Sequence, residues 1–333
     1  MNRPPLALSL GDPAGIGPEI TAKAWRALRE TGPAFMVVGD ALALESAPGG
    51  AAPVTAVTGP EDAVRVFPEA IPVLDLPLAA PVVAGQPSPA YAQAVIRWIE
   101  TGAGLALSGQ VSGLVTAPIA KAPLYAAGFG FPGHTEFLAE LTAAGRHDGA
   151  RGPVMMLTAA DLRVALVTIH EPLAKVSSLL TVEKIVNAGL VVAQALRRDF
   201  GIAAPRLAVA GLNPHAGESG TIGREEIEVV EPAVRALREL GVDARGPAPA
   251  DTLFHAEART RYDAVLCLYH DQALIPVKML DFWGGVNVTL GLPIVRTSPD
   301  HGTGFDIAGR GLARADSLIA AIRLAAEIAA RRG

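Results

Sequence analysis

The chain has 333 residues, half of them hydrophobic, so it can bury a large core and is long enough for two lobes. Charged residues make up 18% of the sequence and the formal net charge is -5, which excludes the basic surface that nucleic-acid binding requires. No apolar run reaches membrane-spanning length, and the first residues lack the apolar stretch of a signal peptide. We therefore expect a soluble, cytoplasmic protein with no nucleic-acid or membrane partner.

Short apolar runs alternate with longer, alanine-rich amphipathic stretches, which is typical of β-α units around a mainly parallel sheet. The predicted fold class is therefore α/β. Most apolar runs are unbroken, as expected for strands that are buried on both faces. The predicted strands cover residues 6–10, 35–39, 113–117, 154–158, 164–169, 207–212 and 264–269, and the predicted helices cover residues 18–30, 91–102, 182–200, 225–240 and 317–331. The proline- and glycine-rich segments 47–60 and 77–89 are predicted to be surface loops.

A glycine-rich loop, residues 11–19, follows the first predicted strand and leads into a helix, with Pro18 in the favourable first helical position. Asp40 ends the next strand, where a ribose-binding acid would stand in a dinucleotide site. The glycines nevertheless run G-x-x-x-G-x-G rather than G-x-G-x-x-G. We therefore reject a standard Rossmann site, although the loop can still lie beside a ligand.

Two regions are candidates for binding an anion. Thr135 precedes the apolar stretch 137–141 and is predicted to cap a helix whose free N–H groups favour an anion, although simple capping also explains it. Lys278, Asn287 and Arg296 interrupt a region rich in apolar residues and glycine. Few acidic residues lie nearby in the sequence, which favours an anionic ligand over surface ion pairs.

Three histidines stand directly after apolar runs: His170, His215 and His270. Ligands of parallel α/β sheets bind beyond the carboxyl ends of the strands, and three imidazoles with an open position are a usual catalytic zinc set. The sequence gaps between the three are long, so no local spacing motif supports a shared metal. A hydrogen-bonded structural role or a substrate contact is the alternative for each histidine.

Other polar residues flank these candidates. Asp271 and Asp251 can orient the imidazoles, and a turn or helix-cap role is the alternative for each. The glycine-rich segment 298–311 is typical of a binding loop, with plain turn formation as the alternative. The one cysteine, Cys267, lies in an apolar run and is predicted to be a buried hydrophobic residue rather than a reactive thiol.

The chain resembles the 4-hydroxythreonine-4-phosphate dehydrogenase family of pyridoxal phosphate biosynthesis over nearly its whole length. The motifs that carry the resemblance are residues 11–19 (GDPAGIGPE), 116–121 (TAPIAK), 132–136 (PGHTE), 212–218 (LNPHAGE), 269–272 (YHDQ) and 285–309. Several long motifs in the same order are more specific than any one of them.

The resemblance implies a two-lobed fold like that of isocitrate and isopropylmalate dehydrogenases, with mainly parallel sheets, flanking helices and a non-Rossmann dinucleotide site. The first lobe, with the cofactor loop, is expected to comprise residues 1–125 plus 285–333. The second lobe, with the metal ligands and dimer contacts, is expected to comprise residues 126–284. The cofactor, NAD or NADP, is expected near His301, Gly302, Asp306, Ile307 and Gly309. A homodimer whose metal site takes ligands from both subunits is also implied.

The resemblance also implies roles for single residues. His170, His215 and His270 would bind a divalent metal, which can be zinc, magnesium, cobalt or manganese. The phosphorylated substrate would be held by His134, Thr135, Lys278, Asn287 and Arg296, and the catalytic candidates are Asp251, Asp271 and Lys278. The implied reaction oxidises 4-phosphohydroxy-L-threonine to 2-amino-3-oxo-4-phosphohydroxybutanoate, which loses carbon dioxide to give 3-amino-2-oxopropyl phosphate in pyridoxine 5'-phosphate biosynthesis.

One residue departs from the family pattern, because Glu171 stands beside His170 where an apolar residue is more common. An alternative reading is a paralogous dehydrogenase that acts on threonate or erythronate 4-phosphate, or on another hydroxy-acid such as a dihydrodiol dicarboxylate. A second alternative is a non-catalytic protein that binds a phosphorylated metabolite. Such a protein would need neither the strand-end histidines nor the dinucleotide loop.

Overall fold

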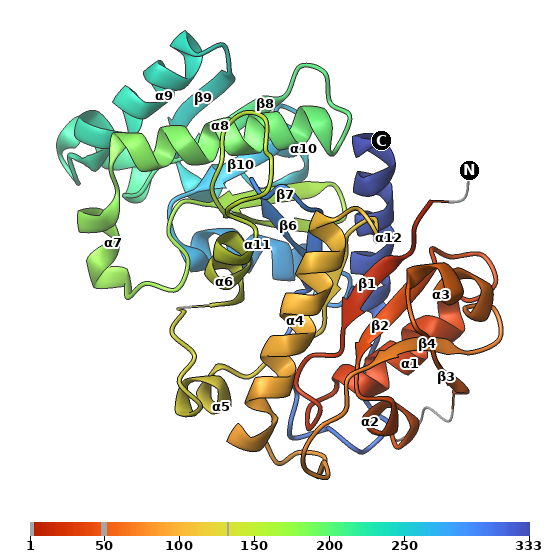
Figure 1. Cartoon of the computed structure of the whole chain (residues 1–333). Helices are drawn as coiled ribbons and strands as arrows, with labels where there is room; N and C mark the ends of the chain where they lie inside the picture. Colours follow the sequence, from red (N-terminus) through yellow and green to blue (C-terminus); the bar gives the residue numbers. More distant parts are fainter. Residues whose placement is uncertain (1–2, 48–51, 132) are drawn as a thin grey trace. The chain divides into compact units, whose positions relative to one another are not determined.

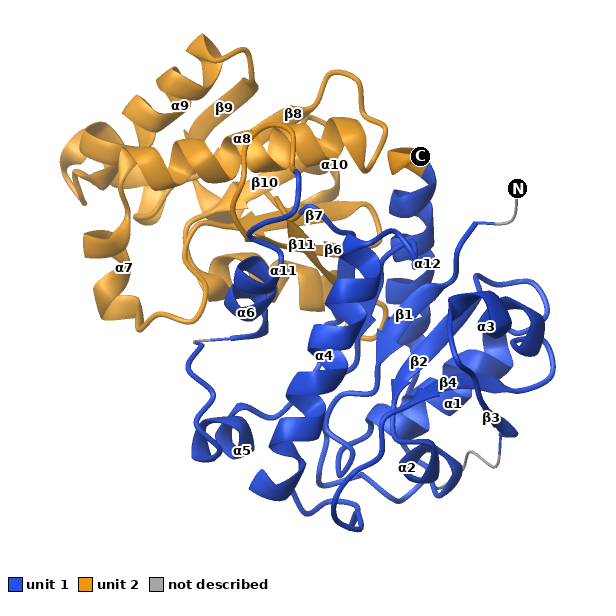
Figure 2. Ribbon diagram, in the orientation of Figure 1, with its two compact units in different colours: residues 1–146, 293–330 blue, residues 147–292, 331–333 orange. Residues whose placement is uncertain are grey.

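The computed structural model describes residues 3–47, 52–131 and 133–333. The chain forms two compact units, which are residues 1–146 with 293–330 and residues 147–292 with 331–333 (Figure 2). Each unit is therefore assembled from segments that are distant in the sequence. The sequence-based division has the same interleaved order but places both main boundaries earlier in the chain.

Unit 1 contains a parallel sheet with the strand order β3-β4-β2-β1-β5, and β12 pairs with β5 (Figure 1). The strands are β1 (Leu6–Ser9), β2 (Phe35–Gly39), β3 (Val54–Ala56), β4 (Ile71–Asp75), β5 (Leu114–Thr116) and β12 (Arg296–Pro299). Strands β1, β2, β5 and β12 are buried along their whole length. This burial agrees with the unbroken apolar runs from which three of them were predicted.

Several helices of unit 1 pack against this sheet. The unit contains α1 (Gly17–Leu28), α2 (Ala41–Glu45), α3 (Pro60–Val66), η1 (Pro89–Tyr91), α4 (Ala92–Leu107), α5 (Lys121–Ala126), α6 (His134–Leu141) and α12 (Asp316–Arg332). Helix α4 contacts β1, β2 and β5, and α3 contacts β2 and β4. The indole N–H groups of Trp25 and Trp98 donate to the carbonyls of Phe67 and Leu76, so both large side chains are buried without an unpaired donor.

Unit 2 contains a mixed sheet with the strand order β11-β6-β7-β10-β8-β9. The strands are β6 (Val154–Ala159), β7 (Leu162–Leu166), β8 (Arg206–Ala210), β9 (Asp243–Ala248), β10 (Ala264–Cys267) and β11 (Val286–Leu290). The pairs β11–β6 and β6–β7 are antiparallel, and the remaining pairs are parallel. The three neighbouring strands β7, β10 and β8 therefore all end at the same edge.

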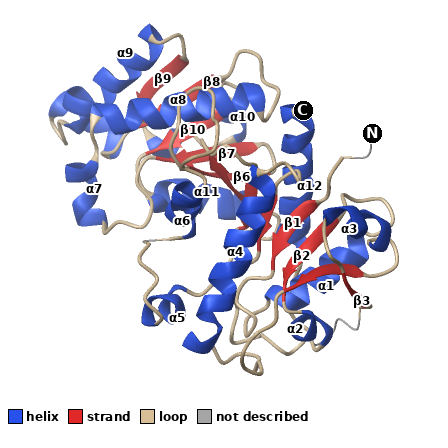
Figure 3. Ribbon diagram, in the orientation of Figure 1, coloured by secondary structure: helices blue, strands red, loops and turns tan. Residues whose placement is uncertain are grey.

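Helices cover both faces of the unit 2 sheet (Figure 3). They are α7 (Leu173–Leu179), α8 (Val182–Arg198), η2 (Pro214–Gly220), the π-helical turn η3 (Glu226–Val230), α9 (Glu231–Glu239), η4 (Ala250–Thr252), α10 (Ala256–Arg259) and α11 (His270–Leu280). Ala273 and Val277 of α11 pack into a core cluster with alternate residues of β6, β7, β8 and β10. Helix α8 contacts the same strands without contributing to that cluster, so it covers the opposite face.

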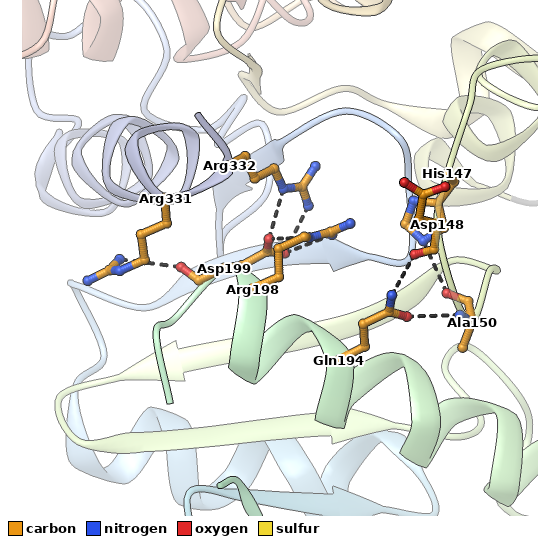
Figure 4. Close-up of polar contacts among 8 residues, drawn as sticks. All are labelled: His147, Asp148, Ala150, Gln194, Arg198, Asp199, Arg331 and Arg332. Atoms are coloured by element: carbon orange, nitrogen blue, oxygen red, sulfur yellow. Dashed lines mark hydrogen bonds and ion pairs between the residues drawn. The ribbon is translucent and has the colours of Figure 1, made fainter. Parts of the chain in front are cut away.

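An ion-pair cluster within unit 2 holds the end of the chain (Figure 4). Asp199 is 1% exposed, and each of its carboxylate oxygens accepts a hydrogen bond from Arg198 and one from Arg332. Arg331 donates to the backbone carbonyl of Asp199. Burial alone would raise the pKa of the Asp199 carboxyl, but the two guanidinium groups outweigh it and lower the pKa.

The α/β fold class and the mainly parallel pairing are confirmed, with some corrections to individual elements. All predicted strands and helices are present with shifted ends, except that predicted helix 225–240 is divided into η3 and α9. The prediction that 47–60 is a loop is wrong in part, because β3 lies there as a short edge strand and Pro60 begins α3; residues 48–51 lie outside the described part. Cys267 is buried as predicted, and burial raises the pKa of its thiol.

Across the described residues, no single helix is both long and apolar enough to cross a bilayer. Helices α7 and α8 meet the length and composition test only as a pair, and this pair is bent by 92°.

Candidate active site

The three strand-end histidines all belong to unit 2. His170 follows β7, His270 follows β10 and His215 follows β8, and these strands are neighbours that run in the same direction. Each histidine lies a few residues beyond the carboxyl end of its strand. Ligands of parallel α/β sheets usually bind at this edge of the sheet. The expectation that these residues come from equivalent strand ends is met.

His170 and His270 form a close pair, with ring centroids 5.7 Å apart. The hydroxyl of Thr168 donates to the backbone carbonyl of Leu268 over 2.7 Å, which ties together the two strand ends that carry the histidines. Thr168 is buried, so this bond is sheltered from water. The two strand ends that lead to these rings are therefore held together by the Thr168 hydrogen bond as well as by the pairing of β7 with β10.

Two of the histidines share a further arrangement. The Nδ1 of His270 lies 2.7 Å from Oδ1 of Asp271, and the Nδ1 of His215 lies 3.1 Å from Oε2 of Glu218. A carboxylate on Nδ1 fixes the tautomer and the orientation of the ring and leaves Nε2 as the metal-binding nitrogen. The Nε2 atoms of His270 and His215 are therefore chemically suited to bind a divalent metal.

His215 does not complete a metal site with the other two within one chain. Among the residues that the structure describes, no group of three or more His, Cys, Asp or Glu side chains is placed to hold a metal ion.

The backbone around His215 is unusual. His215, Ala216, Glu218 and Ser219 have positive φ angles, and Gly217 between them has φ 81°. A left-handed conformation costs a non-glycine residue roughly 1–2 kcal/mol, so this turn must be held by its surroundings. We refer to residues 211–219 as the His215 loop.

The remaining polar candidates of unit 2 have different surroundings. Asp251 is exposed in η4, which contacts η2, and Pro249 rather than Asp251 occupies the cap position of that turn. Glu171 is exposed beside His170. Asn287 lies on β11 with its Oδ1 buried and without a hydrogen bond in the described structure, and the Nζ of Lys278 lies 5.2 Å from the ring centre of Phe282.

Unit 1 supplies a buried cation. Arg296 begins β12, is 4% exposed and donates from Nη2 to the hydroxyl of Thr116 over 2.7 Å. Burial lowers the pKa of Arg296 to about 10, so the guanidinium remains charged at neutral pH. A buried arginine that contacts a neutral hydroxyl is suited to a phosphate or carboxylate ligand.

His134 lies close enough to Arg296 to respond to its charge. Burial, with a smaller contribution from Arg296, lowers the pKa of His134 well below its usual 6.5, so the ring is neutral. Its Nε2 is buried and makes no hydrogen bond within the described residues. A neutral imidazole with an unused nitrogen beside a buried guanidinium can serve as a ligand-binding group.

The prediction that Thr135 caps a helix is wrong. Helix α6 begins at His134 with Gly133 at the cap position, and Thr135 is buried in the first turn. Gly133 can start the helix here because it is small: an added Cβ would lie 2.8 Å from Oε2 of Glu136 and 3.5 Å from Nζ of Lys121. Lys121 thus brings a second cation to the start of α6, a feature that the sequence analysis did not identify.

The two glycine-rich loops of unit 1 pack against each other. The Ile16 amide donates to the carbonyl of Thr303 over 2.9 Å, and a Cβ on Gly15 would lie 2.8 Å from that carbonyl oxygen. Glu19, buried on α1, accepts hydrogen bonds from the Ala313 amide and from Lys23. The predicted cofactor residues follow in this loop: His301, Gly302 and Asp306 are exposed, Ile307 is half-buried, and Gly309 is exposed.

Asp40 and Asp12 have structural contacts in unit 1. The carboxylate of Asp40 accepts from the amides of Ala43 and Leu78 and caps α2, in agreement with rejection of a Rossmann ribose site. Asp12 is buried in the glycine-rich loop and accepts from the Ala14 amide. Burial raises the pKa of the Asp12 carboxyl, while this hydrogen bond lowers it.

The structure is that of a two-unit α/β protein with imidazoles at the ends of parallel strands in one unit and a buried arginine in the other. The chain belongs to the family of the pyridoxal phosphate biosynthetic protein PdxA, whose model matches residues 32–325. The predicted family and the expected oxidoreductase class are thereby confirmed.

Curated relatives and solved structures match almost the whole chain. A protein named 4-hydroxythreonine-4-phosphate dehydrogenase from Caulobacter vibrioides is 75% identical over all 333 residues of both chains. One of the same name from Maricaulis maris is 56% identical and covers 98% of this chain and 97% of its own. The crystal structure of a 4-hydroxythreonine-4-phosphate dehydrogenase from Klebsiella pneumoniae has a TM-score of 0.86 at 41% identity, with 98% of each chain covered. A terephthalate 1,2-cis-dihydrodiol dehydrogenase from Burkholderia xenovorans LB400 has a TM-score of 0.64 at 31% identity, with 97% of this chain and 98% of its own covered.

Proposed function

We propose that the protein is an NAD-dependent dehydrogenase of 4-phosphohydroxy-L-threonine that works in pyridoxine 5'-phosphate biosynthesis. The observation that carries the proposal is the 75% identity, over the full length of both chains, to a relative with this activity in its name. The chemistry of the buried Arg296 and of the strand-end imidazoles supports it, because the substrate carries a phosphate and an alcohol to be oxidised.

The phosphate of the substrate would be bound by the buried cation of unit 1. Arg296 offers a charged, desolvated donor, and His134 and Thr135 stand at the start of α6, where backbone N–H groups favour an anion. Lys121 is added to this set on the basis of its position beside Gly133. Lys278 and Asn287 of unit 2 are proposed as further substrate contacts.

His170, His215 and His270 are proposed to hold a divalent metal, which can be zinc, magnesium, cobalt or manganese. A metal bound there supplies positive charge that lowers the pKa of the substrate hydroxyl. Asp271 keeps the proton on Nδ1 of His270, and Glu218 does the same for His215, so that both rings present Nε2. These two carboxylates are therefore positioning groups in the proposal.

Oxidation moves a hydride from the carbon that bears the hydroxyl to the nicotinamide, and the hydroxyl proton goes to a base. Asp251 is the proposed base, because it is exposed in η4 beside the His215 loop, whereas Asp271 is engaged with His270. The product is a β-keto acid, which loses carbon dioxide and leaves an enol. Lys278 is the proposed donor of the proton that returns this enol to the ketone.

The cofactor is proposed to bind along residues 301–309 of unit 1, at His301, Gly302, Asp306, Ile307 and Gly309. The packing of this segment on the loop of Gly15 and Ile16 gives it a fixed backbone, which supports a binding role over plain turn formation. NAD is the proposed cofactor, and NADP is the alternative.

A cytoplasmic location is also proposed, since NAD-linked biosynthesis belongs there and the only thiol is buried.

A homodimer is proposed because the chain leaves apolar side chains exposed near the histidines. Ile275 and Met279 share one face of α11, and Phe282 and Trp283 follow it with their rings in contact. Met279 is 82% exposed, which is unusual for so apolar a side chain. We propose that a partner subunit covers these residues and contributes a histidine to the metal site.

The alternative activity is that of a paralogue acting on threonate or erythronate 4-phosphate, or on a dihydrodiol dicarboxylate. The similarity to the terephthalate dihydrodiol dehydrogenase favours such a reading, but at 31% identity it is weaker than the similarity to the relatives above. The buried Arg296 suits a carboxylate as well as a phosphate, so the site chemistry alone does not separate these substrates.

The test compares substrates with metal-loaded protein. NADH formation is measured with 4-phosphohydroxy-L-threonine, threonate 4-phosphate, erythronate 4-phosphate and terephthalate dihydrodiol. We expect kcat/KM to be highest for the first compound by at least about tenfold, a difference of about 1.4 kcal/mol in transition-state binding. Preferential turnover of another compound would assign the protein to the paralogue, and tight binding without any turnover would make it a binding protein.

A further inference from the structure

A buried carboxylate outside the predicted site contacts the His215 loop. Glu226 begins the π-helical turn η3 and is 1% exposed. Its Oε1 accepts hydrogen bonds from the amides of Leu212 (2.8 Å) and Asn213 (2.7 Å), and its Oε2 accepts from Nδ2 of Asn213 (2.9 Å). The side chain of Glu226 thus satisfies three donors on the two residues that follow Gly211.

The same loop is fitted closely around this carboxylate. Gly217 lies in the left-handed part of the loop, and a Cβ on it would stand 2.6 Å from Oε2 of Glu226. Gly211, at the other end, is held by a hydrogen bond from its amide to Ala248 and by one from Gln272 to its carbonyl. Hydrogen bonds therefore hold each residue from Gly211 to Asn213 in place. After Pro214, the strained turn begins at His215.

We propose that Glu226 is the positioning residue that holds the left-handed His215 loop in its metal-binding conformation. This inference rests on the proposed role of His215 as a metal ligand. Glu226 does not touch the imidazole; it acts through Leu212 and Asn213, whose backbone directs the turn. Since the left-handed conformation is unfavourable for His215, Ala216, Glu218 and Ser219, the charge-assisted bonds to Glu226 select it over relaxed alternatives.

The substitution Glu226→Gln tests this role with little change in volume. A glutamine has one acceptor oxygen and one NH2 group, so it can accept from the two backbone amides or from Asn213 Nδ2, but not from all three. In either orientation an N–H group of the glutamine faces an N–H group of the loop. The loop is then expected to lose its single conformation while the core of unit 2 keeps its packing.

Glu228→Gln is the matched control. Glu228 lies in the same π-helical turn and carries the same charge, but it is exposed and pairs with Arg224 instead of the His215 loop. His215→Ala reports whether His215 is a metal ligand at all. The probe is Co²⁺, added to the metal-free protein and followed by its visible absorption and by calorimetric titration.

We expect Glu226→Gln to weaken Co²⁺ binding by about 10–100-fold, as is typical for groups that orient metal ligands, and Glu228→Gln to leave it within about twofold. Hydrogen exchange of the peptide covering residues 211–219 should be faster in Glu226→Gln only. A Co²⁺ affinity and spectrum equal to the parent protein in folded Glu226→Gln would overturn the inference, even if its melting temperature falls.

The role of His215 as a metal ligand and the role of Glu226 as a positioning residue give different results in these variants. If His215→Ala leaves Co²⁺ binding unchanged, the proposed metal ligand is wrong and the role of Glu226 falls with it. If His215→Ala weakens binding and Glu226→Gln does not, only the role of Glu226 is wrong. Should Glu226→Gln fail to fold, Glu226→Asp decides, because it keeps the carboxylate but shortens the side chain, so that it cannot keep all three bonds to Leu212 and Asn213; unchanged Co²⁺ affinity in that variant overturns the inference.

Discussion

The Oδ1 of Asp271 lies 2.7 Å from the Nδ1 of His270, and the two residues are neighbours at the start of α11. Helix α11 begins three residues after the last residue of β10. The buried strand and the first turn of the helix therefore both help to set the direction of this imidazole. The carboxylate is exposed, whereas the histidine is half-buried. The exposed carboxylate is therefore suited to orient the ring, and it is not expected to contribute much to the stability of the fold.

Asp271→Asn is therefore expected to affect metal binding more than folding. The amide can no longer accept the Nδ1–H bond at full strength, and Co²⁺ affinity should fall by about 10–100-fold. The melting temperature of the metal-free protein should stay the same, as for the control Asp243→Asn, whose exposed carboxylate pairs with the nearby Arg245 on β9. Unchanged Co²⁺ affinity in Asp271→Asn would contradict an orienting role for this carboxylate.

Arg296→Lys tests the proposed role of Arg296 in binding the substrate phosphate. Lysine keeps the charge but loses the planar pair of donors, so the KM for the phosphorylated substrate should rise about 10–100-fold, the loss of about 1.5–3 kcal/mol of charged hydrogen bonding. The KM for NAD should change little. The control is Arg323→Lys on the exposed side of α12. An equal rise in both KM values would indicate a general structural defect instead of a lost phosphate contact.

The low pKa of His134 predicts how stability depends on pH. The folded protein keeps this ring neutral, while the unfolded chain protonates it below about pH 6.5, so the unfolded state binds more protons in that window. Stability therefore falls as the pH drops below 6.5, with a contribution from this one group of about 1.4 kcal/mol per pH unit until the folded pKa is reached. Denaturant unfolding of the parent and of His134→Gln should show a smaller acid loss in the variant, and equal losses would contradict a neutral His134.

Asp199 is predicted to stabilise unit 2 without affecting catalysis. Asp199→Ala leaves Arg198 and Arg332 without their shared carboxylate and should lower the free energy of unfolding by about 2 kcal/mol, below the 3–5 kcal/mol typical of fully buried pairs because both arginines reach solvent. The folded pKa of Asp199 is lowered, so its contribution is present above pH 3.8 and is lost as the pH falls through the folded pKa. Asp316→Asn, at an exposed ion pair with Arg314, is the control and should cause little change. A loss of kcat in folded Asp199→Ala would show that the cluster does more than stabilise the fold.

The proposed dimer predicts a concentration-dependent activity. Met279→Glu places a charge among the exposed apolar residues of α11 and should shift the protein to the monomer in sedimentation velocity, with loss of activity at low protein concentration. Leu240→Glu changes another exposed apolar residue of unit 2 that lies after α9 and should leave the dimer intact. A Met279→Glu variant that remains dimeric would place the interface elsewhere.

Local sequence patterns were sufficient to predict the strands that carry the histidines. The apolar runs before His170 and His270 indicate buried strands. Such a run spans only a few residues, so it can be recognised without knowledge of contacts that are distant in the sequence. The cap of α6 was mispredicted, because Gly133 and Thr135 both suit that position and the choice depends on the close approach of Glu136 and Lys121. Edge strand β3 was missed because its three residues bury little and lack a recognisable run.

The contacts that position the candidate site were less accessible to sequence reasoning. Glu226 reaches the His215 loop from a π-helical turn, and nothing in the sequence around it sets it apart from the acidic residues beside it. The left-handed turn could not be predicted from the sequence, because His215, Ala216 and Ser219 are residue types that usually avoid that conformation. Both features depend on contacts between segments that only the folded chain brings together.

The stoichiometry of the reaction is the most direct test of the proposed metal-assisted oxidation followed by loss of carbon dioxide. NADH and carbon dioxide are measured together for metal-loaded protein with 4-phosphohydroxy-L-threonine, with chelator-treated protein and His215→Ala as controls. We predict one carbon dioxide for each NADH, and loss of both products in the two controls. Formation of NADH without carbon dioxide, or undiminished turnover after metal removal, would contradict the account.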